Sequence, residues 1–113
     1  DGKANGTSMV VNALAAHFQL PISNWYPDTL PEPGNKTITI NGKGLSDQQI
    51  LEKAIRNTYE IEKDDQNLRK DVREFENLRG SYPVRREFSS YEIRLINETE
   101  GILKKLKELG FKT

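Results

Sequence analysis

The longest periodic pattern of apolar positions in the chain runs from residue 45 to residue 78. Its side chains recur at alternating spacings of three and four residues, which is typical of a heptad seam along one helix. The seam consists of Leu51, Ala54, Thr58, Ile61, Asp65, Leu68, Val72 and Phe75. Ser46 followed by Gln49 predicts a capping box at the start of this helix. A helix of this length, roughly 50 Å at the standard rise, is expected to pack along another helix.

A second amphipathic pattern extends from residue 89 to residue 109. Ser89 and Glu92 predict a capping box at its start, and Gly110 with Phe111 predicts a Schellman-type end. Its apolar face includes Leu95, Ile96, Thr99, Ile102, Leu103, Leu106 and Leu109. Because only a short connection separates the two patterns, we predict an antiparallel hairpin in which the seam meets the second helix. The seam contacts expected from this helix are Ile96, Leu103 and Leu106.

Shorter elements precede the hairpin. Residues 9–19 predict a short helix that ends before Pro21. Residues 21–36 are rich in proline and contain Trp25 and Tyr26, which we interpret as a lid across the helices or as a strap for a protein partner. Residues 37–40 alternate threonine and isoleucine and predict a strand. Its expected partner is residues 22–26 or the same strand of a second subunit.

The predicted fold is mainly α: a long-helix antiparallel hairpin, resembling a bundle or coiled coil, with a short N-terminal helix and a minor β element. Residues 1–8 are expected to be a flexible tail or an expression scar. Residues 9–45 contain the short helix, the strap and the strand, and residues 46–113 form the hairpin, all in one structural unit. Asp65 interrupts the seam, where it either faces water or sets the register of a coiled coil.

Composition and charge narrow the function classes. Seventeen basic residues balance seventeen acidic ones, so no long-range field attracts nucleic acid or a membrane surface. The chain has no cysteine and a single histidine, His17, which excludes thiol chemistry and leaves no metal-ligand cluster. No apolar run approaches the length of a membrane span. We therefore predict no catalysis, no cofactor, no metal, no membrane contact and no small-molecule substrate.

The resulting interpretation is a non-catalytic protein–protein interaction or oligomerisation module of a larger scaffold or assembly protein. The expected location is intracellular, in the cytoplasm or nucleus, and the expected partner is a second copy or another subunit. Candidate partner contacts are Trp25, Tyr26, Ile38, Ile40, Arg85 and Arg86. The alternative is a nucleic-acid-binding helical domain. It would use Arg79, Arg85 and Arg86, or Lys104, Lys105 and Lys107, but these two groups are expected at opposite ends of the last helix.

Overall fold

The computed structural model describes residues 1–97 and 100–113, and it divides into two compact units. The first unit is Asp1–Pro31 and the second is Glu32–Thr113. The division expected from the sequence falls after residues 8 and 45 instead. The observed boundary lies in the proline-rich stretch, where proline rings restrict the backbone and remove amide donors.

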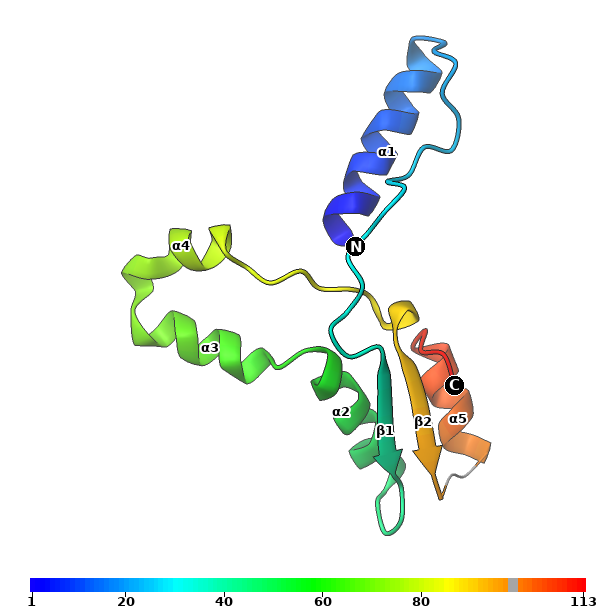
Figure 1. Ribbon diagram of the computed structural model, residues 1–113, viewed down its shortest axis with the longest axis vertical. Helices are drawn as coiled ribbons and strands as arrows, with labels where there is room; N and C mark the ends of the chain where they lie inside the picture. The colour runs from blue at the N-terminus through cyan, green and yellow to red at the C-terminus, as the bar shows by residue number, and fades with distance from the viewer. Residues whose placement is uncertain (98–99) are drawn as a thin grey trace. The chain divides into compact units, whose positions relative to one another are not determined.

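The first unit consists of helix α1 (Gly2–His17) and a segment that returns along it (Figure 1). Residues 1–8, for which a tail or a scar was expected, therefore include the first turns of α1. The returning segment is held by the Asn12 side chain. Its Nδ2 donates to the Trp25 carbonyl at 3.0 Å, and its Oδ1 accepts from the Trp25 amide at 2.8 Å. The predicted strap is thus attached to α1 of its own unit.

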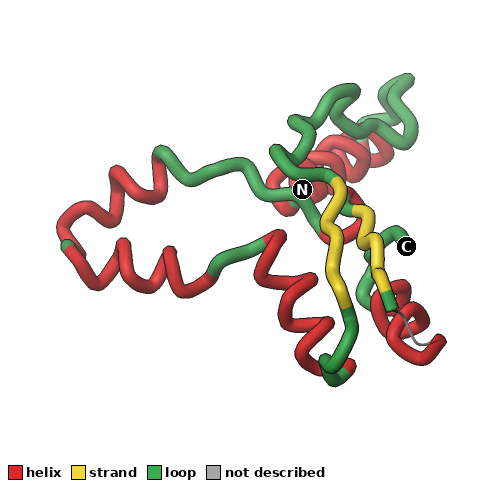
Figure 2. Tube along the Cα trace, turned by 60° about the horizontal axis from the view of Figure 1, so that its bottom comes forward, coloured by secondary structure: helices red, strands yellow, loops and turns green. Residues whose placement is uncertain are grey.

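The second unit is built around a small parallel sheet (Figure 1; Figure 2). Strand β1 spans Thr37–Asn41 and strand β2 spans Glu92–Ile96, in parallel register from one end to the other. Because successive side chains of a strand point to opposite faces, Ile38 and Ile40 lie on the same face as Ile93. All three are buried. The alternation of threonine and isoleucine in β1 therefore gives the sheet one apolar face.

Two helices cover this apolar face. Helix α2 (Asp47–Thr58) contributes Ile50 and Ala54 to the core. Helix α5 (Glu100–Glu108) contributes Ile102 and Leu106, whose exposed fractions are both 0%. The buried side chains among the described residues are all apolar. Their removal from water is the main stabilising contribution to this unit.

Two predicted helix ends are confirmed, the start of α2 and the end of α5. At the start of α2, the Ser46 hydroxyl accepts from the Gln49 amide, and the Gln49 side chain accepts from the Ser46 amide at 2.9 Å. After α5, Gly110 adopts a positive φ of 97°, which glycine tolerates without a Cβ penalty. The chain then turns so that the Phe111 amide donates to the Leu106 carbonyl at 3.1 Å. Phe111 is buried and stacks on Phe88, with ring centroids 4.5 Å apart.

The prediction of one long helix over residues 45–78 is wrong. The chain is extended at Tyr59 and at Asp71, so the segment forms α2, α3 (Ile61–Lys70), a 3₁₀ turn η1 (Val72–Glu74) and α4 (Phe75–Gly80). The break at Asp71 has a visible cause, because its carboxylate accepts from the Arg73 amide at 3.0 Å and caps η1. A short acidic side chain that captures a nearby amide competes with helix continuation.

The prediction of a second long helix over residues 89–109 is also wrong. Its first half is a 3₁₀ turn, η2 (Phe88–Ser90), followed by β2, so the Ser89–Glu92 capping box does not form. Residues 91–96 fit a strand because the apolar residues Tyr91, Ile93 and Leu95 alternate with Glu92 and Arg94. Thr99 of the predicted face lies outside the described residues.

The fold is therefore an α/β arrangement and not a helical hairpin, bundle or coiled coil. The strand at residues 37–40 exists, but its partner is β2 and not residues 22–26 or a second subunit. Parallel pairing requires a long crossover between the strands, and α2, α3, η1 and α4 all belong to it.

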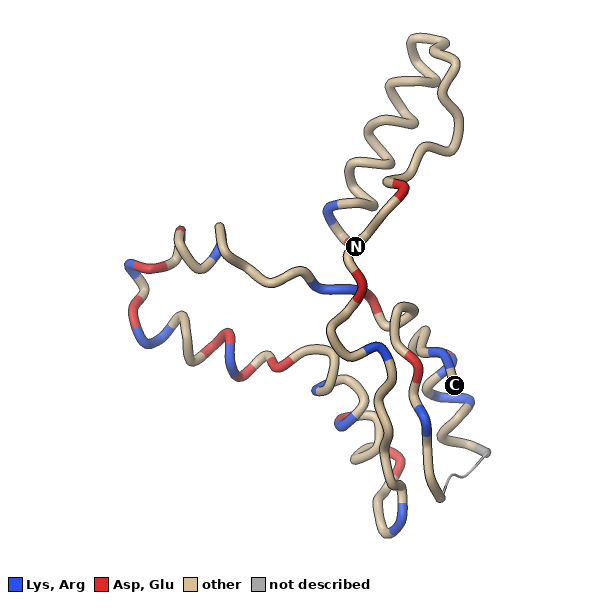
Figure 3. The backbone as a smooth tube through the Cα atoms, viewed as in Figure 1, with Lys and Arg blue, Asp and Glu red and all other residues tan. Residues whose placement is uncertain are grey.

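Residues 61–80, which we call the arm, form the outlying part of this crossover. Helices α3 and α4 lie side by side in both views (Figure 1; Figure 2). The arm contributes no buried residue, since α3, η1 and α4 have none. Acidic and basic residues are interspersed along it, without a long run of either charge (Figure 3).

Candidate functional site

A cluster of polar and aromatic side chains lies where the arm joins the core. We call it the clasp, and it consists of Tyr59, Asp64, Tyr82 and Arg85. One carboxylate oxygen, Asp64 Oδ2, accepts three hydrogen bonds. They come from the Tyr82 hydroxyl at 2.5 Å, the Arg85 Nη2 at 2.8 Å and the Tyr59 hydroxyl at 3.2 Å. The clasp therefore joins the residue after α2, the first turn of α3 and the segment that follows α4.

The Arg85 guanidinium also lies against two aromatic rings. Its Cζ is 3.7 Å from the Tyr59 ring centroid and 4.5 Å from the Tyr82 ring centroid. A guanidinium over a tyrosine ring is attracted by the ring quadrupole, and its planar shape allows stacking. The side chains of Arg85 and Asp64 keep 28% and 30% of their exposure, so this ion pair is screened less than the arm's outer ones.

The clasp shifts the titration of its members. The hydrogen bond from Tyr82 holds the pKa of Asp64 below its usual value, and the Arg85 charge lowers it further, while partial desolvation acts in the opposite direction. The same hydrogen bond raises the pKa of Tyr82 to about 12, because the neutral phenol is the donor. At neutral pH the clasp thus contains a carboxylate, a guanidinium and a neutral phenol.

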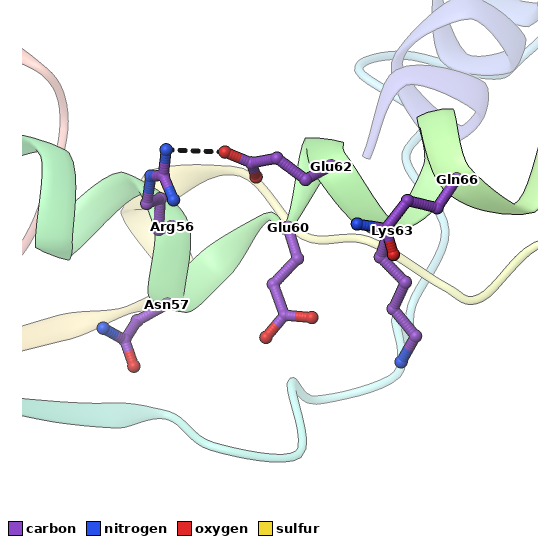
Figure 4. Close-up of a pocket in the computed structure, with 6 residues that line it drawn as sticks. All are labelled: Arg56, Asn57, Glu60, Glu62, Lys63 and Gln66. Carbon is purple, nitrogen blue, oxygen red and sulfur yellow. Dashed lines mark ion pairs between the residues drawn. The ribbon is translucent and has the colours of Figure 1, made fainter.

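An open hollow lies beside the clasp, between the end of α2 and α3 (Figure 4). Its lining residues are Arg56, Asn57, Glu60, Glu62, Lys63 and Gln66. The Arg56 and Glu62 side chains point toward one another and form an ion pair of 2.6 Å. Arg56 also pairs with Glu52 at 2.9 Å. Because its arginine is already neutralised by two carboxylates, the hollow offers no concentrated charge for an anion.

The part of the chain that the structure describes contains no group of three or more His, Asp or Glu side chains placed to hold a metal ion. Nor does any helix there have the length and apolar character that crossing a membrane requires.

The residues of the predicted seam do not lie on one surface. Ala54 is buried in the core, while Ile61, Leu68, Val72 and Phe75 are exposed on the arm. Asp65, which was expected to interrupt a coiled-coil seam, is exposed and pairs with Arg69 at 2.8 Å. The remaining seam residues, Leu51 and Thr58, are half-buried. Of the contacts expected from the second helix, Leu103 is half-buried, Leu106 is buried, and Ile96 is exposed at the end of β2.

The residues singled out as partner contacts are also divided. Ile38 and Ile40 have exposed fractions of 2% and 3%, so their side chains belong to the core. Trp25 and Tyr26 are exposed in the first unit. Arg85 is engaged in the clasp, and Arg86 is half-buried beside it in the sequence.

The two basic groups expected for nucleic-acid binding are largely paired with acids. Arg79 pairs with Glu76 at 3.0 Å and Arg85 pairs with Asp64. On α5, Lys105 pairs with Asp47 at 2.9 Å and ties this helix to the start of α2. Their charges are therefore locally compensated.

Sequence reasoning missed the clasp. It drew attention to Asp65, but the neighbouring Asp64 makes the long-range contacts. The chain is extended at Tyr59, between α2 and α3, so the helical periodicity starts anew in α3. Heptad positions counted from α2 therefore do not show which residues share a face of α3. The available signal was that Tyr59 directly precedes the acidic run at residues 60–65 and that Tyr82 lies three residues before Arg85.

The chain resembles known proteins over nearly its whole length. Residues 29–110 match a family model described as "Domain of unknown function (DUF3410)". The erythronate-4-phosphate dehydrogenase of Marinobacter nauticus is 32% identical over 99% of this chain and 31% of its own length. The proteins of the same name from Edwardsiella ictaluri and Proteus mirabilis are 35% and 36% identical, each over 98% of this chain and 29% of their own length. The chain therefore spans about 30% of the length of these curated relatives.

These comparisons correct several expectations. A non-catalytic scaffold or assembly protein, and the nucleic-acid-binding alternative, are contradicted because the relatives that match the whole chain are named as an enzyme. The expected absence of a small-molecule substrate is contradicted as well, since their name specifies erythronate 4-phosphate. A nuclear location is not supported, because these relatives are bacterial. Sequence patterns failed here because heptad-like spacing carries no information about the reaction of the enzyme to which a segment belongs.

Proposed function

We propose that this chain, which belongs to the DUF3410 family, forms part of an enzyme that oxidises erythronate 4-phosphate. One observation carries the proposal. Proteins of that name from several bacteria align with 98% or more of this chain at 32% to 36% identity. Since the chain spans about 30% of their length, the proposal concerns a complete enzyme of which this chain is one part.

The chemistry that the proposal implies is the oxidation of a hydroxyl group to a carbonyl. The C–H hydrogen leaves with its electron pair, formally as hydride, to an electron acceptor, and the hydroxyl proton passes to a base. The substrate carries a carboxylate and a phosphate, so it is strongly anionic at pH 7 and does not cross a lipid bilayer freely. This supports the further proposal that the enzyme works in the bacterial cytoplasm, where phosphorylated metabolites are retained.

The test is a segment exchange in the Marinobacter nauticus relative. The matched segment of that dehydrogenase is replaced by this chain, and oxidation of erythronate 4-phosphate is followed with NAD⁺, NADP⁺ or a redox dye as acceptor. We expect the chimera to retain turnover within roughly tenfold of the parent, which corresponds to a loss of at most about 1.4 kcal/mol of transition-state stabilisation.

The control is the same exchange with the Edwardsiella ictaluri segment, which comes from a protein of the same name. An active control beside an inactive chimera of normal circular dichroism and solution mass would contradict the proposal. A chimera that oxidises erythronate as well as erythronate 4-phosphate would contradict the substrate assignment, because recognition of the phosphate would then be absent.

A further inference from the structure

The arm lacks the means to order itself. Its helices α3 and α4 are short, and neither they nor η1 bury a residue. Isolated helices of fewer than about 12 residues are marginal in water, because nucleation costs more than a few hydrogen bonds return. Tertiary contacts must therefore keep the arm folded.

Glu62 at the start of the arm pairs with Arg56 of α2 at 2.6 Å, but the ion pairs further along the arm are local. Asp65 pairs with Arg69 four residues on, Arg73 with Asp71, and Arg79 with Glu76 three residues away. Their arginine side chains are between 70% and 86% exposed. Exposed pairs of this kind add little to stability, and they support single turns without connecting one side of the arm to the other.

The clasp differs because its contacts cross the arm. Asp64 lies in the first turn of α3, whereas Tyr82 and Arg85 follow the end of α4, so the hydrogen bonds close the arm at its base. Tyr59 extends the same cluster to the end of α2, where the core begins. Hydrogen bonds to a charged group in a partly desolvated site are among the stronger ones in proteins.

We propose that Tyr59, Asp64, Tyr82 and Arg85 act as a conformational clasp that keeps the arm, residues 61–80, folded and attached at its base to the core. The sheet, α2 and α5 form their core without these side chains, so opening the clasp releases the arm alone. This inference stands independently of the proposed enzymatic activity, because it concerns contacts within one chain.

The test is amide hydrogen exchange, measured by NMR on the 113-residue chain. Asp64→Asn keeps the shape of the side chain but removes the charge that accepts three hydrogen bonds. We expect exchange of the α3 amides to accelerate on the order of tenfold, while the Ile93 amide of β2 is unchanged. Tyr82→Phe removes one hydrogen bond and leaves the ring over Arg85, so it should accelerate exchange by a smaller factor.

The matched control is Asp65→Asn, at the neighbouring position, which breaks only the local pair with Arg69. We expect it to change arm exchange by about twofold or less. Equal effects of Asp64→Asn and Asp65→Asn would overturn the clasp. It would also be overturned if Asp64→Asn accelerated the Ile93 amide as much as the arm, or if the arm of the unmodified chain already exchanged at unfolded rates.

Discussion

Replacement of Leu106 by alanine tests the core most directly. The Leu106 side chain is 0% exposed, between α5 and the sheet. The substitution removes three carbon atoms, which at about 0.8 kcal/mol per buried methylene is about 2.4 kcal/mol of transfer free energy. The cavity left in a packed core raises the expected loss of unfolding free energy to about 3 to 4 kcal/mol. For a unit of this size such a loss is a large part of the total stability.

Leu109→Ala is the matched control, because the same side chain lies three residues further on and is 41% exposed. It should lose about 1.4 kcal/mol of unfolding free energy, since 41% of this residue is already exposed to water and no closed cavity forms. Urea unfolding followed by circular dichroism gives both values, provided that the denaturant slopes agree. In the helical hairpin predicted from sequence, both leucines lie on one packed face. Equal losses, or a loss below about 1 kcal/mol for Leu106→Ala, would refute the core described above.

Two further predictions concern a close approach and a titration. Gly42→Ala would place a Cβ 2.9 Å from the Asn97 carbonyl oxygen and 3.2 Å from Ile50 Cδ1, so it should destabilise the fold by about 1 to 3 kcal/mol. The control is Gly34→Ala, whose Cβ would meet no atom within 4 Å and which should leave the unfolding free energy unchanged in the same urea titration. Tyr82, faced by Asp64, Arg85 and Tyr59, should give a late step near pH 12 in tyrosinate absorbance, and Tyr82→Phe should remove it. Because folding raises the pKa of Tyr82, this hydrogen bond contributes its full stabilisation of the folded state below pH 10, and the contribution is lost as the pH rises toward 12. A single absorbance step near pH 10 in the unmodified chain would contradict the hydrogen bond.

The local signals that succeeded were those that depend on few residues. Ser46 with Gln49 and Gly110 with Phe111 were readable because caps satisfy particular backbone groups at fixed offsets. The alternation at residues 37–40 likewise predicted a strand, because threonine and isoleucine suit a half-buried sheet.

The failures came from patterns that two structures satisfy equally well. Residues 92–96 continue a helical face in one reading and alternate across a strand in the other, and only β1 beside them decides the outcome. The break at Asp71 depends on one side chain that captures a nearby amide. The clasp joins residues that are 18 and 21 positions apart, a separation that no local pattern encodes. The similarity to erythronate-4-phosphate dehydrogenases could not be predicted from periodicity, because the spacing of apolar residues carries no information about the reaction of a relative.

The parallel pairing of β1 with β2 also determines the order of events during folding. Thr37 pairs with Glu92, so the sheet can form only after a loop of about 50 residues has closed. Such non-local contacts slow the search for the native state. Once the clasp has formed, the residues between Asp64 and Arg85 no longer contribute to this loop, and the remaining entropic cost of pairing Thr37 with Glu92 is about 0.5 kcal/mol lower.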